Sequence, residues 1–349
     1  MDNIEYGREL SHISKCSGSF TELVQAGGGN TSVKTDDRYM LIKASGYHLT
    51  EVTPGSGYSV VDHKLIRDTF SSSEVDDSEE QEILKKALCE GKKPSIETFL
   101  HSITKKYTIH THPLAVSVLA SKSGGMEELK KLFPQASIVD YATPGIKLAK
   151  TYYKAMKQQG VSDVVFLKNH GLIVSADSSE AALGLQYDTV TRVMEYLHMD
   201  TAGFADQMSV YNAVYGADTS LSVCRITAPD VVKASEISGG QWAYRYSPDC
   251  IVYCGNKFLL LDSGDDIGEK LRRHIEQYGM PKVIVSGDNV YAAAPNAAKA
   301  AEIGVVLDFT AKLYLKSRED GFDCDVLSDS ECSFLLNWDS EKYRSSLGR

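Results

Sequence analysis

The segment SIETFLHSITKKYTIHTHPLAV, residues 95–116, most limits the possible folds because its apolar residues change period halfway along. The apolar residues of its first half are spaced as on one face of a helix: Ile96, Phe99, Leu100 and Ile103. Its second half is a run of β-branched and apolar residues, which is typical of a strand. A helix that leads directly into a strand predicts a mixed α/β fold.

Two histidines, His110 and His112, lie two residues apart in the strand half of this segment. Alternate side chains of a strand point to the same face, so both imidazoles project on one side, about 6.6–6.8 Å apart. That spacing lets both rings reach one point. The alternative is a solvent-facing pair on a half-buried strand, and for this motif alone the surface pair is the simpler interpretation.

The composition sets the class of protein. The chain has 349 residues, of which 42% are hydrophobic and 24% are charged, so it can bury one large core or two moderate ones. A formal net charge of -10, with both signs mixed along the chain, argues against nucleic acid or an anionic membrane as partner but leaves a phosphorylated substrate open. The chain starts without a basic segment followed by an apolar one, and no apolar run reaches the ~18 residues of a membrane span. We therefore expect a cytoplasmic protein, and the seven scattered cysteines favour reduced thiols.

The pattern changes near residue 225, which predicts two domains. From there the segments PDCIVYCGNKFLLLD, GEKLRRHIEQYG, KVIVSGDNVYAAA and NAAKAAEIGVVLDFTAKLYL indicate strand, strand, helix, strand, strand and helix. The chain from Lys316 onward is acidic and weakly periodic. We predict a first domain at residues 1–220 and a smaller α/β domain of unknown role at residues 225–349, with an acidic tail.

Three further features of the first domain place polar groups where a site could form. AGGGNTS is a glycine-rich loop whose N–H groups can hold a phosphate, although its spacing matches neither the dinucleotide fingerprint nor the P-loop, and a tight turn is the alternative. Ser95 and Glu97 flank the start of the predicted helix, where a carboxylate can also simply compensate the helix dipole. His170 lies in the turn of VVFLKNHGLIVSA, a strand–turn–strand pattern in which a histidine is commonly exposed without a role.

Three histidines and one carboxylate are the ligand set of a catalytic divalent metal ion of the zinc type. Neutral imidazoles bind zinc at about 2.0–2.1 Å and leave an open position for a substrate. A His-x-His pair with a third histidine far downstream is a common but unspecific metal pattern. Taken together, His110, His112, His170 and Glu97 favour a metal site.

Six short motifs give the first domain a resemblance to a known family: GGGNTS, KASG, PSIET, HTHP, YATPG and KNHGLI. Their order and intervals resemble the class II aldolase/adducin family, which includes fuculose- and rhamnulose-phosphate aldolases and ribulose-phosphate 4-epimerase. The resemblance covers roughly residues 1–215. IKASGYHL and PSIETFLH are most similar to the aldolase half of the bifunctional rhamnulose-1-phosphate aldolase/lactaldehyde dehydrogenases, and SPDCIVYCGNKF resembles the α/β segment that follows that half. We expect no dehydrogenase half in this sequence, since only the acidic tail follows residue 316.

The resemblance implies a fold and a role for each matching residue. The implied fold is a three-layer α/β domain around a central, mostly antiparallel sheet. His110, His112 and His170 resemble the metal ligands, and Glu97 resembles the acidic residue that contacts the metal and is displaced to act as general acid/base. The residues implied to bind the substrate and its phosphate are Gly28, Gly29, Asn30, Ser45, Gly46 and Ser95. Tyr141, in YATPG, is a further catalytic candidate, with a packed aromatic side chain as the alternative.

One position departs from the family pattern. Many members have Ser-Ser-Glu where this chain has Ser95-Ile96-Glu97. The lost hydroxyl implies that a phosphate is bound differently or that the substrate carries none. Glu97 itself favours an aldolase, because the epimerases of the family carry Asp at this position.

The resemblance implies a metal-dependent lyase that cleaves a ketose 1-phosphate, or a related sugar acid phosphate, through an enediolate, with Zn²⁺ or another divalent metal as cofactor. The alternatives are an epimerase, dehydratase or decarboxylase that uses the same enediolate, or an adducin-like scaffold without the metal. The complete set of three histidines and Glu97 argues against the scaffold. Members of the family commonly form cyclic tetramers with active sites at subunit boundaries, so we expect a homotetramer.

Overall fold

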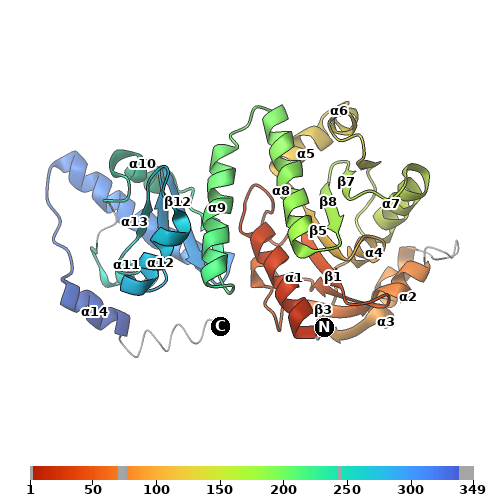
Figure 1. Cartoon of the computed structure of the whole chain (residues 1–349), viewed down its shortest axis with the longest axis horizontal. Coiled ribbons are helices and arrows are strands. Elements are labelled where there is room, and N and C mark those ends of the chain that lie inside the picture. The colour runs from red at the N-terminus through yellow and green to blue at the C-terminus, as the bar shows by residue number, and fades with distance from the viewer. Residues whose placement is uncertain (1–2, 70–74, 76, 243–244, 338–349) are drawn as a thin grey trace. The chain divides into compact units, whose positions relative to one another are not determined.

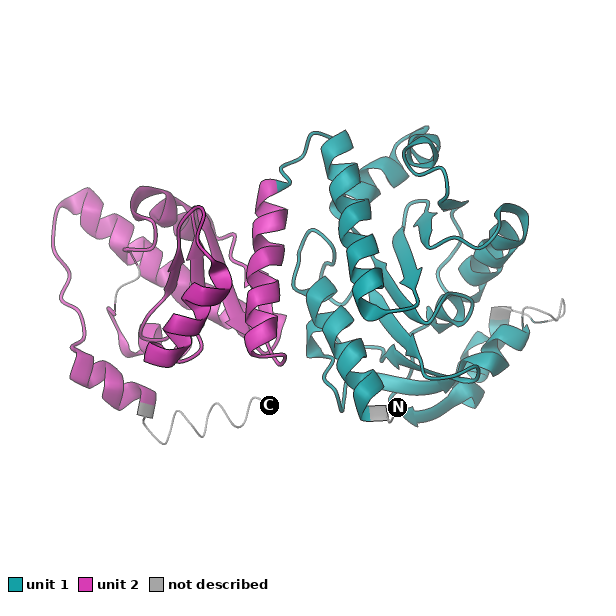
Figure 2. Ribbon diagram, in the orientation of Figure 1, with its two compact units in different colours: residues 1–201 teal, residues 202–349 magenta. Residues whose placement is uncertain are grey.

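The computed structural model describes residues 3–69, 75, 77–242 and 245–337, and the chain divides into two compact units. Unit 1 is Met1–Thr201 and unit 2 is Ala202–Arg349 (Figure 2). This division lies before the expected boundary at residues 220–225, so residues 202–220 group with unit 2 rather than with unit 1.

Unit 1 is built around one eight-stranded sheet (Figure 1). Its strands are β1 (Asn30–Lys34), β2 (Tyr39–Lys43), β3 (Tyr58–Asp62), β4 (Leu88–Gly91), β5 (Tyr107–Thr111), β6 (Ser137–Val139), β7 (Val164–Leu167) and β8 (Gly171–Ala176). They lie in the order β4-β3-β2-β1-β5-β8-β7-β6, and of the neighbouring pairs only β6 and β7 are parallel. The predicted central, mostly antiparallel sheet is confirmed.

Helices cover both faces of this sheet and complete the three layers. One face carries α1 (Asn3–Gly18), α5 (Leu114–Ser121), α6 (Gly125–Leu132) and α8 (Ser179–Tyr196), and the other carries α2 (His63–Asp68), α3 (Glu80–Ala87), α4 (Thr98–Ser102) and α7 (Ile146–Gln159). Two short 3₁₀ helices, η1 (Leu49–Glu51) and η3 (Asp77–Glu79), lie in connections. Phe99 of α4 and Tyr152 of α7 are buried with Ile173 of β8 in one core. Burial of such apolar side chains, at about 1.5–3 kcal/mol each, fixes α4 against the sheet.

Unit 2 is a four-stranded sheet between two layers of helices. Its strands β9 (Ser222–Arg225), β10 (Leu259–Leu261), β11 (Val283–Ser286) and β12 (Asn289–Ala294) lie in the order β10-β11-β12-β9. One face carries α9 (Ala202–Ala217) and α12 (Ile267–Tyr278), and the other carries α10 (Pro229–Ser238), α11 (Pro248–Cys254) and α13 (Ala297–Asp320); α14 (Asp329–Asn337) packs on α11. The α/β character expected for the C-terminal part of the chain is confirmed.

The segment PDCIVYC was predicted as a strand and is instead helix α11. Pro248 lies in its first turn, where the missing N–H costs little. Cys250, Ile251 and Cys254 are buried, and their spacing is that of one helix face. The β-branched and aromatic residues that suggested a strand therefore belong to a short helix whose packing overrides their local preference.

Two expectations about the chain as a whole can be compared with the described residues. All seven cysteines are free thiols, as their odd number and scatter indicate. Within the described part of the chain, no helix combines the length and the apolar character that crossing a bilayer requires.

Candidate metal centre

Glu97, His110, His112 and His170 come together where β5 meets β8. His110 lies within β5, His112 follows the last residue of that strand, and His170 directly precedes β8. β5 and β8 are paired with His110 opposite Ile173, which brings the β7–β8 turn beside the end of β5. Glu97 is the residue that caps the start of α4. One ligand atom from each of the four side chains lies within 4.8 Å of the others.

The three imidazoles direct their Nε2 atoms at a common point. Nε2 of His110 lies 3.2 Å from Nε2 of His170 and 3.3 Å from Nε2 of His112. Oε1 of Glu97 lies 3.4 Å from Nε2 of His110 and 3.1 Å from Nε2 of His170. Four ligands placed about 2.0–2.1 Å from a tetrahedral zinc ion are about 3.3–3.4 Å from one another. The spacing of the donor atoms therefore fits one ion held by all four side chains.

Hydrogen bonding alone leaves this cluster unbalanced. Nδ1 of His110 lies 2.9 Å from the carbonyl oxygen of Leu172, which can only accept, so Nδ1 carries the ring proton. A neutral His110 then directs the lone pair of Nε2 toward a carboxylate oxygen and two other ring nitrogens. His110 is completely buried, and a bound cation would offset the repulsion among these lone pairs. Three imidazoles with one carboxylate suit zinc and other divalent ions that bind nitrogen.

The pKa values of the cluster depend on burial and on the carboxylate at its centre. Burial alone would raise the pKa of Glu97, but the neighbouring imidazoles of His110 and His170 outweigh it and hold the pKa well below its usual range. Burial alone would lower the pKa of His110, but Glu97 raises it above its usual value. Burial, together with the positive charge of its neighbours, lowers the pKa of His112 to about 4. Glu97 is therefore ionised at neutral pH, and His112 is neutral and free to act as a ligand.

The glycine-rich loop lies directly against the cluster. A Cβ atom on Gly28 would lie 3.0 Å from Nδ1 of His112, and one on Gly29 would lie 3.0 Å from the carbonyl oxygen of His110. Gly29 also has a φ of 74°, which side chains rarely adopt. The glycines are required because the loop packs against two of the histidines.

Two of the predicted substrate-binding residues hold Glu97 in place. The side-chain amide of Asn30 donates to Oε2 of Glu97, and the hydroxyl of Ser95 accepts from the backbone N–H of Glu97 at 3.2 Å. Oδ1 of Asn30 is buried and has no hydrogen-bond partner among the described residues. Asn30 therefore both orients the carboxylate and presents one further polar atom inside the site.

Ser45 and Gly46 lie in the exposed loop after β2. Ala44 forms an isolated bridge with Pro94, and the N–H of Ser45 donates to the carbonyl of Lys93 at 2.9 Å. These contacts place the loop beside the segment that leads to Ser95. Ser45, Gly46 and Ser95 thus line one region next to Glu97, as the family resemblance implies.

Tyr141 differs from the other predicted residues. It lies between β6 and α7, its side chain is 61% exposed, and it has no described hydrogen bond or ring contact with the four clustered side chains. Within this single chain, Tyr141 is therefore not joined to the metal cluster by any described contact.

His101 and Lys43 also lie near Glu97, and the sequence analysis missed both. Nδ1 of the completely buried His101 lies 2.7 Å from the hydroxyl of Ser32, and burial lowers the pKa of His101 to about 3. Lys43 is buried in β2, donates to the carbonyl of Tyr47 at 2.7 Å, and has a pKa lowered by burial against the opposing effect of Glu97. Two signals could have found them: His101 lies one helical turn after Glu97, and Lys43 interrupts the apolar strand YMLIK.

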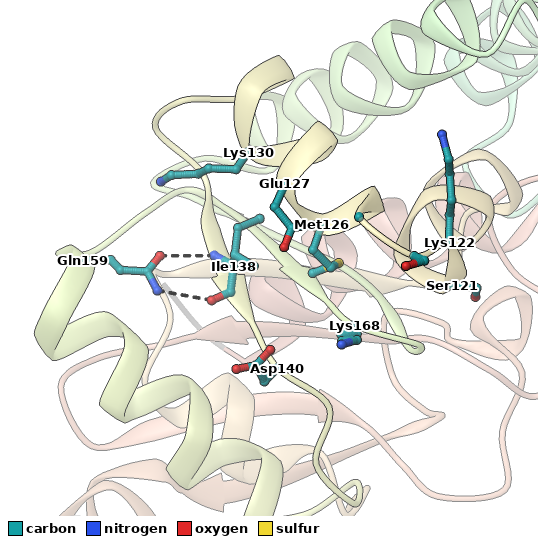
Figure 3. Close-up of a pocket in the computed structure, with 11 residues that line it drawn as sticks. Ser121, Lys122, Met126, Glu127, Lys130, Ile138, Asp140, Gln159 and Lys168 are labelled. Carbon is teal, nitrogen blue, oxygen red and sulfur yellow. Dashed lines mark hydrogen bonds between the residues drawn. The ribbon is translucent and has the colours of Figure 1, made fainter.

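A cavity of about 590 Å³ in unit 1 is separate from this cluster. Lys122, Glu127, Asp140 and Lys168 are among the residues that line it, and none of the four clustered side chains is. Figure 3 shows the amide of Gln159 bonded to the backbone of Ile138 at its edge, with both distances 3.2 Å. The cavity is open and of mixed charge, so we do not assign the metal chemistry to it.

Residues 16–196 match the family model described as "Class II Aldolase and Adducin N-terminal domain". This chain belongs to that family. The resemblance seen in the six sequence motifs is thereby confirmed, while the finer similarity to the aldolase half of the bifunctional enzymes stays a prediction.

Individual members of the class II aldolase and adducin family are similar to unit 1 at modest identity. The "Uncharacterized oxidoreductase YuxG" of Bacillus subtilis is 26% identical over 202 residues, a match that covers 54% of this chain and 29% of YuxG. The chain therefore spans less than a third of that relative's length. Among solved structures, the N-terminal class II aldolase domain of a conserved protein from Thermoplasma acidophilum is 26% identical, with 54% of this chain and 92% of that chain covered and a TM-score of 0.49. An L-fuculose 1-phosphate aldolase is 24% identical, with 55% and 85% covered and a TM-score of 0.41.

Proposed function

We propose that unit 1 is a divalent-metal-dependent lyase of the aldolase type that cleaves a ketose 1-phosphate or a related sugar acid phosphate. The observation that carries this proposal is the tetrahedral spacing of three Nε2 atoms and one carboxylate oxygen in a buried cluster. His110, His112 and His170 would hold the ion, which we expect to be Zn²⁺. The similarity to a fuculose 1-phosphate aldolase supports the substrate class.

The reaction requires one proton acceptor and stabilisation of one negative charge. Cleavage of a C–C bond next to a carbonyl begins when the hydroxyl on the departing carbon loses its proton, and the bond electrons then form an enediolate. A divalent ion in the site would supply Lewis-acid stabilisation of that charge. Protonation of the enediolate carbon completes the ketone product, so the proton that was removed can be returned.

Glu97 is our candidate for the group that accepts and returns this proton. Its pKa lies well below the usual range, so it is a carboxylate at neutral pH. Asn30 and Ser95 hold its side chain and backbone, which fixes the carboxylate beside the histidines. We expect the substrate to displace Glu97 from the ligand set, after which Glu97 is free to take the hydroxyl proton.

The substrate is bound, in this proposal, by the glycine-rich loop and the loop after β2. Gly28, Gly29 and Asn30 provide a close backbone approach on one side, and Ser45, Gly46 and Ser95 lie on the other. Ile96 replaces the second serine of the family pattern and is 38% exposed. The lost hydroxyl leaves the phosphate with fewer donors, so the anionic group of the substrate is a main object of the test below.

The family resemblance also suggests that a neighbouring subunit completes the site. Tyr141 is 61% exposed and has no described contact with its own cluster, which is consistent with a role at the site of another copy in a homotetramer. In such an assembly the neighbour would cover the mouth of the cluster and exclude water.

The experiment combines metal analysis with a cleavage assay. Purified chain should contain one divalent ion per subunit, and chelation should remove both the ion and the release of aldehyde from ketose 1-phosphates. Each sugar should be assayed with and without its phosphate, because Ile96 makes that comparison informative. A chain that binds no divalent ion would leave the adducin-like scaffold as the better account, whereas a metal-loaded chain that interconverts sugars without releasing an aldehyde would indicate an epimerase.

A further inference from the structure

The most exposed large apolar side chain of the described residues lies on α13 in unit 2. Val305 is 72% exposed, and Phe309, one turn later, is 53% exposed. Ala298 and Ala301 are exposed at the same helical spacing before Val305. The other side of the helix is buried in the core of unit 2, at Leu307 for example. α13 therefore carries a second apolar stripe that no other described residue covers (Figure 1).

Charged residues at either end of this stripe select its partner. Glu302 lies three residues before Val305, and Lys312 lies three residues after Phe309, so Leu307 is the midpoint of both pairs. If two α13 helices cross at Leu307 in opposite directions, Val305 of each copy faces Phe309 of the other, and Glu302 faces Lys312. In a parallel pair the like charges would face each other instead, which is unfavourable.

We propose that α13 binds a second copy of this chain, as an antiparallel helix pair with a two-fold axis at Leu307. Closed two-fold contacts of this kind use one self-complementary surface on both copies. The small side chains Ala298 and Ala301 leave room for the larger side chains in the second half of the partner's stripe, so the stripe is complementary in volume as well as in charge.

Both charges of the stripe are accessible in the single chain. The Glu302 carboxylate lies 2.9 Å from Nζ of Lys299, and the Lys312 ammonium lies 2.5 Å from the carboxylate of Asp308. Their side chains are 45% and 60% exposed. Such exposed pairs within a helix contribute little to stability, so each charge can also pair with a second copy.

The interface is limited to one helix pair. The 24 residues of α13 make a helix about 36 Å long. A contact of this size is smaller than that of a permanent dimer, so we expect it to dissociate on dilution. It is independent of the assembly proposed for unit 1 and would double the mass of whatever assembly unit 1 forms.

The test is the mass of the full chain by sedimentation equilibrium over a range of concentrations. Val305→Asp places two uncompensated carboxylates in the apolar centre and should halve the mass of the assembled wild type, with an unchanged circular dichroism spectrum. Val161→Asp is the matched control, because Val161 is 69% exposed but lies in unit 1 between α7 and β7, and it should leave the mass unchanged. Equal masses for the wild type and Val305→Asp at every concentration would overturn the proposal.

Charge reversal tests the antiparallel register. Glu302→Lys or Lys312→Glu alone should raise the dissociation constant about tenfold, because two equivalent attractions become repulsions. The double variant carries both reversed charges and should return to within about twofold of the wild type. A double variant that dissociates as readily as the single variants would exclude this register.

Discussion

Each unit contains a cluster of polar side chains around one carboxylate, and the two clusters differ in what surrounds that carboxylate. In unit 2, Asp206 accepts hydrogen bonds from the hydroxyls of Ser286 at 2.8 Å and Tyr291 at 2.6 Å and from the amide of Asn289 at 3.2 Å. In unit 1, the carboxylate of Glu97 faces the ring nitrogens of His110 and His170 at 3.4 and 3.1 Å.

The difference teaches how to separate a structural carboxylate from a ligand-binding one. All three side chains around Asp206 can donate, so the carboxylate is satisfied by the protein itself. Around Glu97, the ring proton of His110 is committed to the carbonyl of Leu172, and the remaining atoms face one another with lone pairs. A cluster that lacks donors needs a cation, whereas a cluster that contains them joins parts of the fold.

Loss of one ligand should have the largest effect. His112→Ala removes one of the three nitrogens that converge on the site, so we expect loss of stoichiometric metal and of C–C cleavage while the fold remains. Metal content by mass spectrometry and the circular dichroism spectrum measure the two outcomes. His48→Ala, at an exposed histidine outside the cluster, should retain its metal. Normal metal content and turnover in His112→Ala would refute the assignment of the site.

Removal of the proposed base should have the next largest effect. Glu97→Gln keeps the size of the side chain but cannot take up the hydroxyl proton, so turnover should fall by ~10²–10⁴ while the three imidazoles still hold the metal. Glu90→Gln, at an exposed carboxylate of β4, is the control for loss of one charge in the same unit. If Glu97→Gln cleaves substrate at the wild-type rate, another group must be the base.

The carboxylate of unit 2 should affect stability and not chemistry. Asp206→Ala leaves the donors of Ser286, Asn289 and Tyr291 without their acceptor, so the free energy of unfolding of unit 2 should fall by about 2–4 kcal/mol. Urea unfolding measures this, and metal content should not change. Asp288→Ala, in the exposed turn between β11 and β12, should change the free energy by less than about 0.5 kcal/mol. A change of metal content in Asp206→Ala would contradict the distinction between the two clusters.

A smaller effect is expected from acid on the metal-free chain. Burial lowers the pKa of His101 to about 3 from an ordinary value of 6.5, so between these values the unfolded chain binds a proton that the folded chain does not. The free energy of unfolding should therefore fall as the pH is lowered from about 6.5 toward 3, by up to about 1.4 kcal/mol per pH unit from this group. His101→Gln keeps a partner for Ser32 and should flatten this dependence in urea unfolding. The same slope in the variant would assign the acid sensitivity to other groups.

Local patterns predicted the elements of the site better than they predicted how those elements meet. The change of period at residues 95–116 correctly indicated α4 and β5. His112 lies just after the strand and not within it, and its convergence with His170 depends on the pairing of β5 with β8, which local periodicity does not encode. α11 was missed because the residues of PDCIVYC prefer strands locally while their packing is helical.

The polar residues around the site were harder to predict than the ligands. The ligands are chemically distinctive residue types, and their motifs resemble those of a known family. His101 is held by Ser32, a residue 69 positions away in the chain, so its role depends on a long-range contact. Asn30 was expected to bind substrate, and its hydrogen bond to Glu97 follows from the packing of β1 beneath α4, which the sequence alone does not specify.

The pairing of β1 with β5, in which Asn30 lies opposite His110, sets the order in which the site can form. Pairs such as β1–β2, β2–β3 and β7–β8 join neighbours in the chain and close short loops, whereas β1–β5 must close a loop that contains β2, β3, β4 and α4. The ligands come from α4, from the end of β5 and from the β7–β8 turn, so the complete set exists only once this distant pairing is in place. An ion would then arrive too late to guide the chain, and its main kinetic effect would be to slow unfolding of the finished domain.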